Sequence, residues 1–329
     1  MGFRFRIDES IAAGFRRIAI SQISRAIRHL AEDEDQAIAI HEARKCLKRV
    51  RALLRLVQPA LGAEHYSREN ARFRDIGRML AASRDRHVLR QTIAALAVAA
   101  DPPQQAALQA LTEVVSRDAN DDSLPMDTTQ AIEAAIAALE KARKDFKKLR
   151  PDFSSGDVIR DGVKRTYRAA QKALEIASVN PDDGTLHEWR KTVQTHWRHM
   201  LLLSEAWPEF FALRANAAKD LADMLGEDHD LAVLMDFVAS GENRAIGPDH
   251  AEAVIALASD RQRRLRSNAF ASGAFLFAED AKVLSKRISR YWHEARSRGD
   301  TDRPAGDLRR NNGLPPDARQ PLAKRTPQA

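Results

Sequence analysis

Apolar residues recur along most of the chain at intervals of three and four, the spacing of one face of a helix. Ala, Leu, Arg and Glu dominate these segments, whereas alternating β-branched stretches are scarce. The pattern predicts helices over residues 9–31, 35–57, 64–99, 104–118, 128–149, 156–178, 185–204, 210–240, 249–270 and 275–297. Turn-forming stretches such as Pro59 to Gly62 separate them. The sequence therefore predicts an all-α fold.

Two motifs occur twice, in the same order and at nearly the same spacing. HEARK at 41–45 recurs as HEWRK at 187–191, which lies 146 residues later. RDIGRMLAASRDRHVL at 74–89 aligns with KDLADMLGEDHDLAVL at 219–234, which lies 145 residues later. Two ordered blocks at almost one offset indicate an internal repeat. Each half is expected to be an α-helical bundle.

The repeat divides the chain into three parts. We expect a first helical half at 1–150 and a second at 151–298. The remainder, 299–329, is rich in Pro, Gly, Asp and Arg and has no apolar period. That composition predicts a disordered tail.

The helix predicted over 35–57 has one apolar arc and one basic arc at 100° per residue. Its apolar arc consists of Ala43, Cys46, Leu47, Val50, Leu53, Leu54 and Val57. Its opposite arc consists of His41, Arg44, Lys45, Lys48, Arg49, Arg51 and Arg55. Like charges at this spacing repel by a few tenths of a kcal/mol per pair, and only Glu42 relieves them. Two readings stay open: a solvated or neutralised basic face, and a binding site for an extended anion about 21 Å long.

The whole chain is basic, with a formal net charge of +7 and an isoelectric point near 9.7. Nucleic acid, other polyanions and anionic lipid are the partners that such a charge favours. Single-stranded nucleic acid sites usually combine a basic groove with stacking aromatic rings. Aromatic residues make up only 6% of this chain, and the basic arc has none. The composition therefore favours a ligand made of phosphate alone.

The chain shows no signal peptide and no membrane span by its pattern. The N-terminus lacks an apolar run of signal-peptide length, and the longest uncharged run, 91–100, is too short to cross a bilayer. The single cysteine, Cys46, rules out an intrachain disulfide and fits a reducing compartment. We expect a soluble, cytoplasmic protein without a membrane partner. The oligomeric state stays open.

Each half contains a His that opens a basic helix and, after it, a helix of the form L-[GA]-x-x-[RH]-D-x-x-V. This repeated pair of motifs resembles the CHAD family (conserved histidine α-helical domain). The resemblance covers roughly residues 1–298. It implies two four-helix subdomains related by pseudo-two-fold symmetry, with the basic helices lining a central cleft. It also implies binding of inorganic polyphosphate and recruitment to polyphosphate granules.

The resemblance and the basic arcs together select the candidate site residues. The primary set is His41, Arg44, Lys45, Lys48, Arg49, Arg51, Arg55, Arg84, His187, Arg190, Lys191 and Arg198. A possible secondary set is Arg17, Arg25, Arg74, Arg165, Arg168 and Lys172. In the second half Gln194 replaces Lys48 and Leu201 replaces Arg55, so we expect the second half to bind anions more weakly.

The two repeated histidines have a functional and a structural interpretation. Thr185 and Glu188 form a capping-box pattern, which would place His187 in the first turn of its helix, near free backbone N–H groups. His187 would then donate to a phosphate, and its protonation below about pH 6.5 would strengthen the contact. The alternative is a structural hydrogen bond. Asp33 or Asp35 could cap the first helix well before His41.

No motif for catalysis, a metal or a cofactor is found. His196 and His199 form an HxxH pair on the apolar side of their helix, where a structural role is expected. Asp85 and Asp230 are expected to pair with arginines of the basic helices rather than to act as acid or base. We expect a binding protein without enzymatic activity or cofactor. The rivals are a generic nucleic-acid- or nucleoprotein-associated protein, a granule scaffold, and a phosphatase or kinase.

Overall fold

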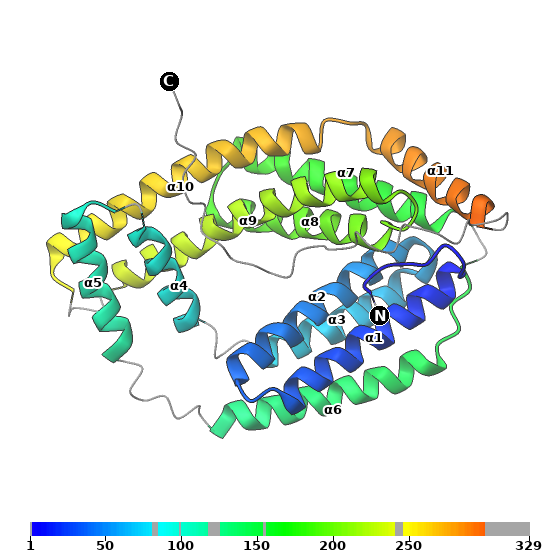
Figure 1. Ribbon diagram of the computed structural model, residues 1–329, viewed down its shortest axis with the longest axis horizontal. Helices are drawn as coiled ribbons and strands as arrows, with labels where there is room; N and C mark the ends of the chain where they lie inside the picture. The colour runs from blue at the N-terminus through cyan, green and yellow to red at the C-terminus, as the bar shows by residue number, and fades with distance from the viewer. Residues whose placement is uncertain are drawn as a thin grey trace, which may run out of the picture.

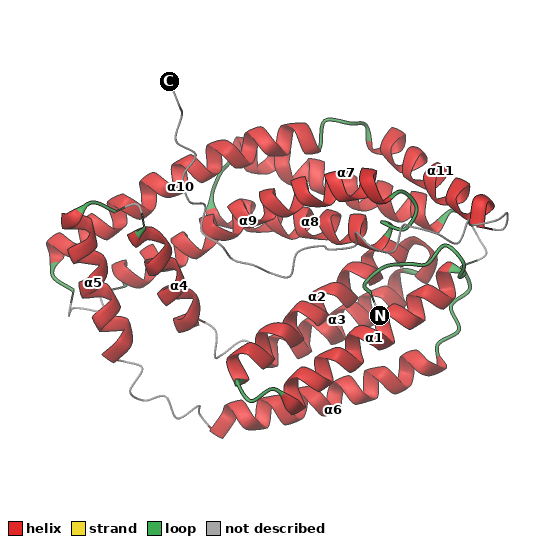
Figure 2. Ribbon diagram, viewed as in Figure 1, coloured by secondary structure: helices red, strands yellow, loops and turns green. Residues whose placement is uncertain are grey.

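The protein is all-helical over the residues that its structure, a computed structural model, describes: 2–80, 85–98, 100–117, 126–153, 156–240 and 246–299. Figure 2 shows helices joined by short loops, without a strand in the described part. The helices are α1 (Ile11–Glu32), α2 (Gln36–Leu61), α3 (Ala63–Met79), α4 (Asp85–Ala97), α5 (Pro102–Arg117), α6 (Met126–Lys148), α7 (Val158–Val179), α8 (Asp183–Leu202), α9 (Pro208–Ala239), α10 (Pro248–Leu276) and α11 (Ala281–Gly299).

Two groups of packed helices lie side by side (Figure 1). In one group α1 packs on α2 and α6, and α3 packs on α2 and α6. In the other group α8 packs on α7 and α9, α10 packs on α9, and α11 packs on α7. The two groups meet where α2 contacts both α7 and α8. The basic helix α2 therefore lies at the contact between the groups, not on an outer surface.

A smaller core lies at the far end of the second group. There α4 and α5 pack on each other and on the neighbouring parts of α9 and α10 (Figure 1). Leu89, Leu108 and Leu111 contribute to this core together with Leu234 and Val254. Residues of the predicted first half thus pack on the second half. The boundary at 150 and the pseudo-two-fold symmetry stay predictions.

The single helix predicted over 64–99 is wrong, because two helices occupy it. The helix α3 ends at Met79 and α4 begins at Asp85, whereas the aligned segment of the second half is one helix, α9. Carbonyl groups in the last turn of a helix lack intrahelical donors. At the end of α3 the Arg44 guanidinium supplies them, since its Nη1 donates to the carbonyls of Gly77 (2.7 Å) and Leu80 (3.1 Å).

The turn predicted over Pro59 to Gly62 is confined to Gly62, because α2 continues to Leu61 with Pro59 in its last turn. Proline has no N–H, so the carbonyl of Arg55 loses its intrahelical donor. The guanidinium of Arg165 on α7 replaces it, with Nη2 at 2.8 Å from that carbonyl oxygen. Pro59 therefore creates an acceptor that fixes Arg165 against α2.

A glycine allows α7 to approach α2 this closely. A Cβ atom added at Gly162 would lie 1.8 Å from the carbonyl oxygen of Leu56. No larger residue fits at that crossing. The contact between the two groups of helices is therefore set by backbone approach as well as by side-chain packing.

Candidate anion-binding site

The helix α2 is amphipathic as predicted, and its apolar arc is buried. The seven apolar-arc residues are at most 2% exposed. All seven residues of the basic arc are half-buried, because α7 and α8 cover part of that side. Neighbouring helices therefore cover part of the basic arc, which is neither fully solvated nor fully buried.

Four arginines from three helices gather where α2, α7 and α8 meet: Arg49, Arg55, Arg165 and Arg198, called here the arginine cluster. Arg198 is only 9% exposed. Burial, followed by the charges of Arg49, Arg55 and Arg190, lowers the pKa of Arg198 to about 9. Burial and the charge of Arg55 also lower the pKa of Arg165. Arg198 and Arg165 are therefore partly desolvated and lie within reach of the positive charge of Arg55.

Within the described residues, no carboxylate forms an ion pair with any member of the arginine cluster. Arg165 and Arg198 instead donate to neutral carbonyl groups: Arg165 Nη2 to that of Arg55 at 2.8 Å, and Arg198 Nη1 to that of Gln194 at 2.8 Å. Buried charges are normally paired because an unpaired charge costs several kcal/mol. The cluster thus combines fixed donors with positive charge that lacks a counterion from the described chain.

Two aromatic rings lie against the cluster. The helical pattern of the sequence does not predict these contacts. The guanidinium carbon of Arg198 is 5.0 Å from the ring centre of Trp197, and that of Arg49 is 5.8 Å from the ring centre of Phe3. Such cation–π contacts hold guanidinium planes in place. Phe3 precedes the first helix, so no helical spacing could have predicted its position.

A buried histidine joins the three helices beneath the cluster. His199 Nε2 lies 2.9 Å from the carbonyl oxygen of Ala52 on α2, and its Nδ1 lies 3.2 Å from the Thr166 hydroxyl on α7. Burial lowers the pKa of His199 to about 3, so it stays neutral near pH 7. His196 is likewise buried, beside the rings of Tyr167 and Phe277. The structural role expected for this HxxH pair fits these contacts.

The aligned arginines of the two His-bearing helices pack against the next helix in each half. Arg44 binds the end of α3, as described above. The guanidinium of Arg190 lies against α9 where Gly226 leaves room, since a Cβ there would come within 2.8 Å of Arg190 Nη2. The charge of Arg190 reaches Arg198 of the cluster, and part of the role of both aligned arginines is to hold neighbouring helices.

Other members of the primary set also have partners from the chain. Lys45 pairs with Glu42 at 2.7 Å, and Lys191 pairs with Glu188 at 2.5 Å. Arg51 Nε donates to Asn70 at 3.0 Å, and burial followed by the charges of Arg55, Arg74 and Arg78 lowers its pKa to about 10. Lys48 is half-buried on the same face of α2. Arg84 lies outside the described residues, as does the predicted tail beyond 299.

Of the secondary set, Arg165 joins the cluster and the others lie apart from it. Arg17 pairs with Glu9 and donates to the carbonyl of Arg4, near the start of α1. Arg74 pairs with Asp75 at 2.9 Å. Arg25, Arg168 and Lys172 are exposed. The charge of Arg25 nevertheless reaches Cys46 on α2, which places it near the edge of the basic helix.

The capping box predicted at Thr185 is wrong, because α8 begins two residues earlier. Asp182 is the N-cap residue, and its carboxylate accepts from the backbone N–H of Thr185 at 2.7 Å. His187 therefore lies in the second turn. Likewise Asp35 caps α2, so His41 lies past the first turn, as the alternative expected.

His187 faces a second histidine instead of free backbone N–H groups. Its ring centre lies 4.8 Å from that of His229 on α9, and its Nδ1 is buried without a hydrogen-bond partner. Burial, followed by the charges of Lys191, His229 and Arg190, lowers the pKa of His187 to about 4. His187 is therefore neutral near pH 7 in the free protein.

The pairing expected for Asp230 is not seen, since it forms no ion pair within the described chain. The buried carboxylate of α9 is Asp228, which is 2% exposed and binds Arg266 of α10 at 2.6 Å. Arg266 also binds Asp183 at the start of α8. The two ion pairs of Arg266 therefore join α8, α9 and α10. No group of three or more metal-ligating side chains occurs among the described residues.

A family model for the CHAD domain matches residues 17–239, about two thirds of the chain. The match includes α2, α7 and α8 and therefore the whole arginine cluster. No curated protein matches this chain. In the described part of the chain, no helix has the length and apolar content to cross a lipid bilayer.

Proposed function

The chain belongs to the CHAD family, and we propose that its arginine cluster and the flanking basic residues of α2 and α8 bind inorganic polyphosphate. This ligand is the one that the family resemblance implies. The observation that carries the proposal is the cluster itself: four arginines from three helices, two of them held by backbone carbonyl groups, and none in an ion pair with a carboxylate of the described chain.

The chemistry of the cluster suits a chain of phosphates. Guanidinium groups donate to phosphate oxygens in pairs, and such charge-assisted hydrogen bonds are about twice as strong as neutral ones. A polyanion would also remove the mutual repulsion of the four arginines, which the free protein has to tolerate. His41 and Lys48 extend the basic face toward the start of α2, and Arg51 lies between the two cluster arginines of that helix. We infer that the chain of phosphates lies along α2.

The aromatic rings near the cluster favour polyphosphate over nucleic acid as the ligand. The nearby rings of Phe3 and Trp197 lie against guanidinium groups of the chain itself. Bases of a single strand would need such rings for stacking. We propose binding without catalysis, with recruitment to polyphosphate granules as its cellular consequence. A phosphatase or kinase would instead show metal-dependent turnover of polyphosphate or of a nucleoside triphosphate.

Competition between polyanions tests this proposal. We expect long-chain polyphosphate to bind, and an equal concentration of DNA or RNA phosphate to displace little of it. Affinity is expected to fall as salt rises, because each neutralised phosphate releases counterions. The measurement is a fluorescence titration at two salt concentrations. Equal displacement by every polyanion would contradict the proposal and favour the generic nucleic-acid-associated alternative.

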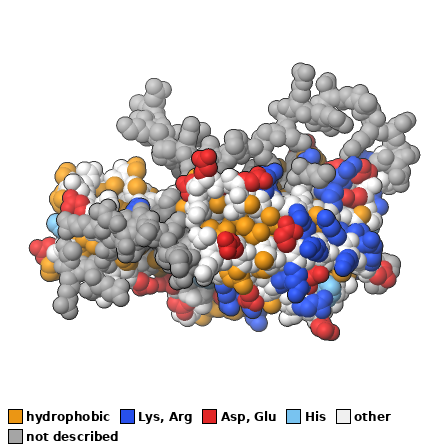
Figure 3. All heavy atoms as spheres, turned by 90° about the horizontal axis from the view of Figure 1, so that it is seen from below, with side chains coloured by type: hydrophobic (Ala, Val, Ile, Leu, Met, Phe, Trp, Pro, Cys, Tyr) orange, Lys and Arg blue, Asp and Glu red, His pale blue; other side chains and the backbone are white. Residues whose placement is uncertain are grey.

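The outer surface provides the control for this titration. Lys and Arg side chains also gather toward one end of the face seen in Figure 3, which includes α6. The lysines Lys141 and Lys144 of α6 are exposed. The double variant K141E/K144E is expected to change polyphosphate affinity less than twofold at physiological salt, since exposed charges are well screened. A loss as large as that from cluster variants would indicate binding to the general surface.

Binding is expected to tighten as the pH falls from 7.5 to 5.5. His187 has a lowered pKa, near 4, in the free protein, and a bound anion beside it raises that pKa. Binding then takes up a proton, so affinity rises with acidity until His187 is protonated in the free protein too. Dissociation constants measured at three pH values check this, and H187N is expected to show a shallower slope. The exposed His250 supplies the control variant H250N; equal slopes for both variants would contradict the role of His187.

A further inference from the structure

A second basic hollow lies between α7 and α11, apart from the arginine cluster. It has a volume of about 240 Å³, and its lining consists of Arg160, Asp161, Lys164, Lys282, Ser285 and Lys286. The two helices are antiparallel: Gln171 late in α7 donates to the carbonyls of Phe277 and Glu279 just before α11, and Ser289 binds Asp157 just before α7. Basic residues at i, i+4 spacing on both helices therefore face one groove.

The charge of this hollow is unbalanced. Asp161 is the one carboxylate in the lining, and it is already bound by Arg160, whose Nε lies 3.0 Å from Oδ1. The three lysines Lys164, Lys282 and Lys286 form no ion pair with any described residue. Three ammonium groups thus face one small space, and the one further carboxylate whose pKa the charge of Lys282 lowers is Asp280, which does not line the hollow.

The lining also indicates what kind of anion fits. All six side chains are polar or charged, and none is aromatic, so the hollow offers no ring on which a base could stack. Ser285, which is fully buried, also lines the hollow, and its hydroxyl donates to the carbonyl of Lys282 at 3.1 Å. The volume is below the 300 Å³ or so typical of drug-sized ligands. A compact and entirely polar anion matches both its size and its chemistry.

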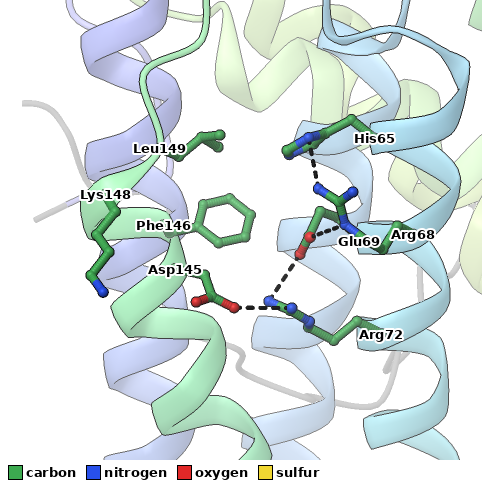
Figure 4. Close-up of a pocket in the computed structure, with 8 residues that line it drawn as sticks. All are labelled: His65, Arg68, Glu69, Arg72, Asp145, Phe146, Lys148 and Leu149. Atoms are coloured by element: carbon green, nitrogen blue, oxygen red, sulfur yellow. Dashed lines mark hydrogen bonds and ion pairs between the residues drawn. The ribbon is translucent and has the colours of Figure 1, made fainter.

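A hollow between α3 and α6 differs from this one in how its charges are paired. This hollow has a volume of about 330 Å³. Its lining consists of His65, Arg68, Glu69, Arg72, Asp145, Phe146, Lys148 and Leu149. Figure 4 shows that its arginines are already bound there: Arg72 reaches both Asp145 (3.0 Å) and Glu69 (3.2 Å), and Arg68 binds Glu69. Its charges are mostly neutralised from within, whereas those of the α7–α11 hollow are not.

We propose that the α7–α11 hollow is a second anion site, which binds a compact inorganic phosphate of the pyrophosphate class. Lysine ammonium groups act as point charges and donate to phosphate oxygens in many orientations, as a small free anion requires. The site is independent of the function proposed above. Lys282 and Lys286 lie on α11, outside the residues matched by the family model and outside the arginine cluster.

Calorimetric titration of the full chain with pyrophosphate tests the site. We expect the wild type to show a binding event that K282E/K286E weakens at least tenfold. The double variant K141E/K144E carries the same change of net charge on exposed lysines of α6 and is expected to weaken it less than twofold. Thermal melts would establish that both variants are folded. Unchanged binding in K282E/K286E, or equal weakening in both variants, would overturn the proposal.

A second measurement uses the unaltered protein, so it does not depend on how the variants fold. Pyrophosphate is expected to slow chemical acetylation of Lys164, Lys282 and Lys286 at least threefold, with little effect on Lys141 and Lys144. Peptide mass spectrometry measures the extent of acetylation of all five lysines in one sample. Equal protection of the two groups of lysines, or none, would count against a defined site.

Discussion

Replacing Arg198 with methionine is expected to weaken polyphosphate binding at least tenfold while making the free protein more stable. Arg198 is 9% exposed and experiences the charges of Arg49, Arg55 and Arg190. Its loss removes a charge-assisted contact worth about 1.5–3 kcal/mol to the complex. The same loss relieves a buried, unpaired charge in the free protein, which is expected to add about 1 kcal/mol or more to the free energy of unfolding. Methionine fills a comparable volume and keeps the helix.

Two measurements on the same variant check this expectation: polyphosphate titration and thermal unfolding without ligand. Arg90 on α4 is exposed and lies outside the cluster, so R90M is the matched control and should change neither quantity appreciably. A variant R198M that is less stable and binds normally would mean that Arg198 is a packing residue. Opposite signs for binding and stability are the signature of a residue kept for its ligand.

Replacing Gly162 with alanine is expected to lower the free energy of unfolding by about 3 kcal/mol, the upper part of the usual range for overpacking. The added Cβ would lie 1.8 Å from the Leu56 carbonyl oxygen, and backbone cannot rotate away as a side chain can. The helices α2 and α7 would have to separate. That movement would also pull Arg165 from the carbonyl of Arg55, so polyphosphate affinity is expected to fall in the same variant.

Urea unfolding and polyphosphate titration measure the two effects of G162A. Gly77 in α3 is the control, because a Cβ there meets only Leu47 Cδ1 at 3.7 Å, an ordinary contact. G77A is expected to stabilise by up to about 1 kcal/mol, the difference in helix propensity. A similar stability for G162A and the wild type would show that the two helices do not need their close crossing.

Much of the helical architecture could be predicted from periodicity, because an amphipathic helix repeats its apolar positions every three to four residues whatever lies beside it. The apolar arc from Ala43 to Val57 is buried as predicted. Helix boundaries were less predictable. Pro59 reads as a turn signal, yet α2 continues past it because a side chain 110 residues away satisfies the carbonyl that the proline leaves free.

The sequence by itself determined the helices, the basic arc of α2 and the family, since all three depend on residue types at short spacing or on repeated motifs. Only the tertiary structure decided which basic residues form one site. A helical wheel shows the face on which Arg49 and Arg55 lie, but not that Arg165 and Arg198 from two other helices meet them, nor that Arg44 and Arg17 are bound elsewhere. The reason is physical: helical period is a local property, whereas the crossing of α2 with α7 and α8 depends on long-range packing and on the room left at Gly162.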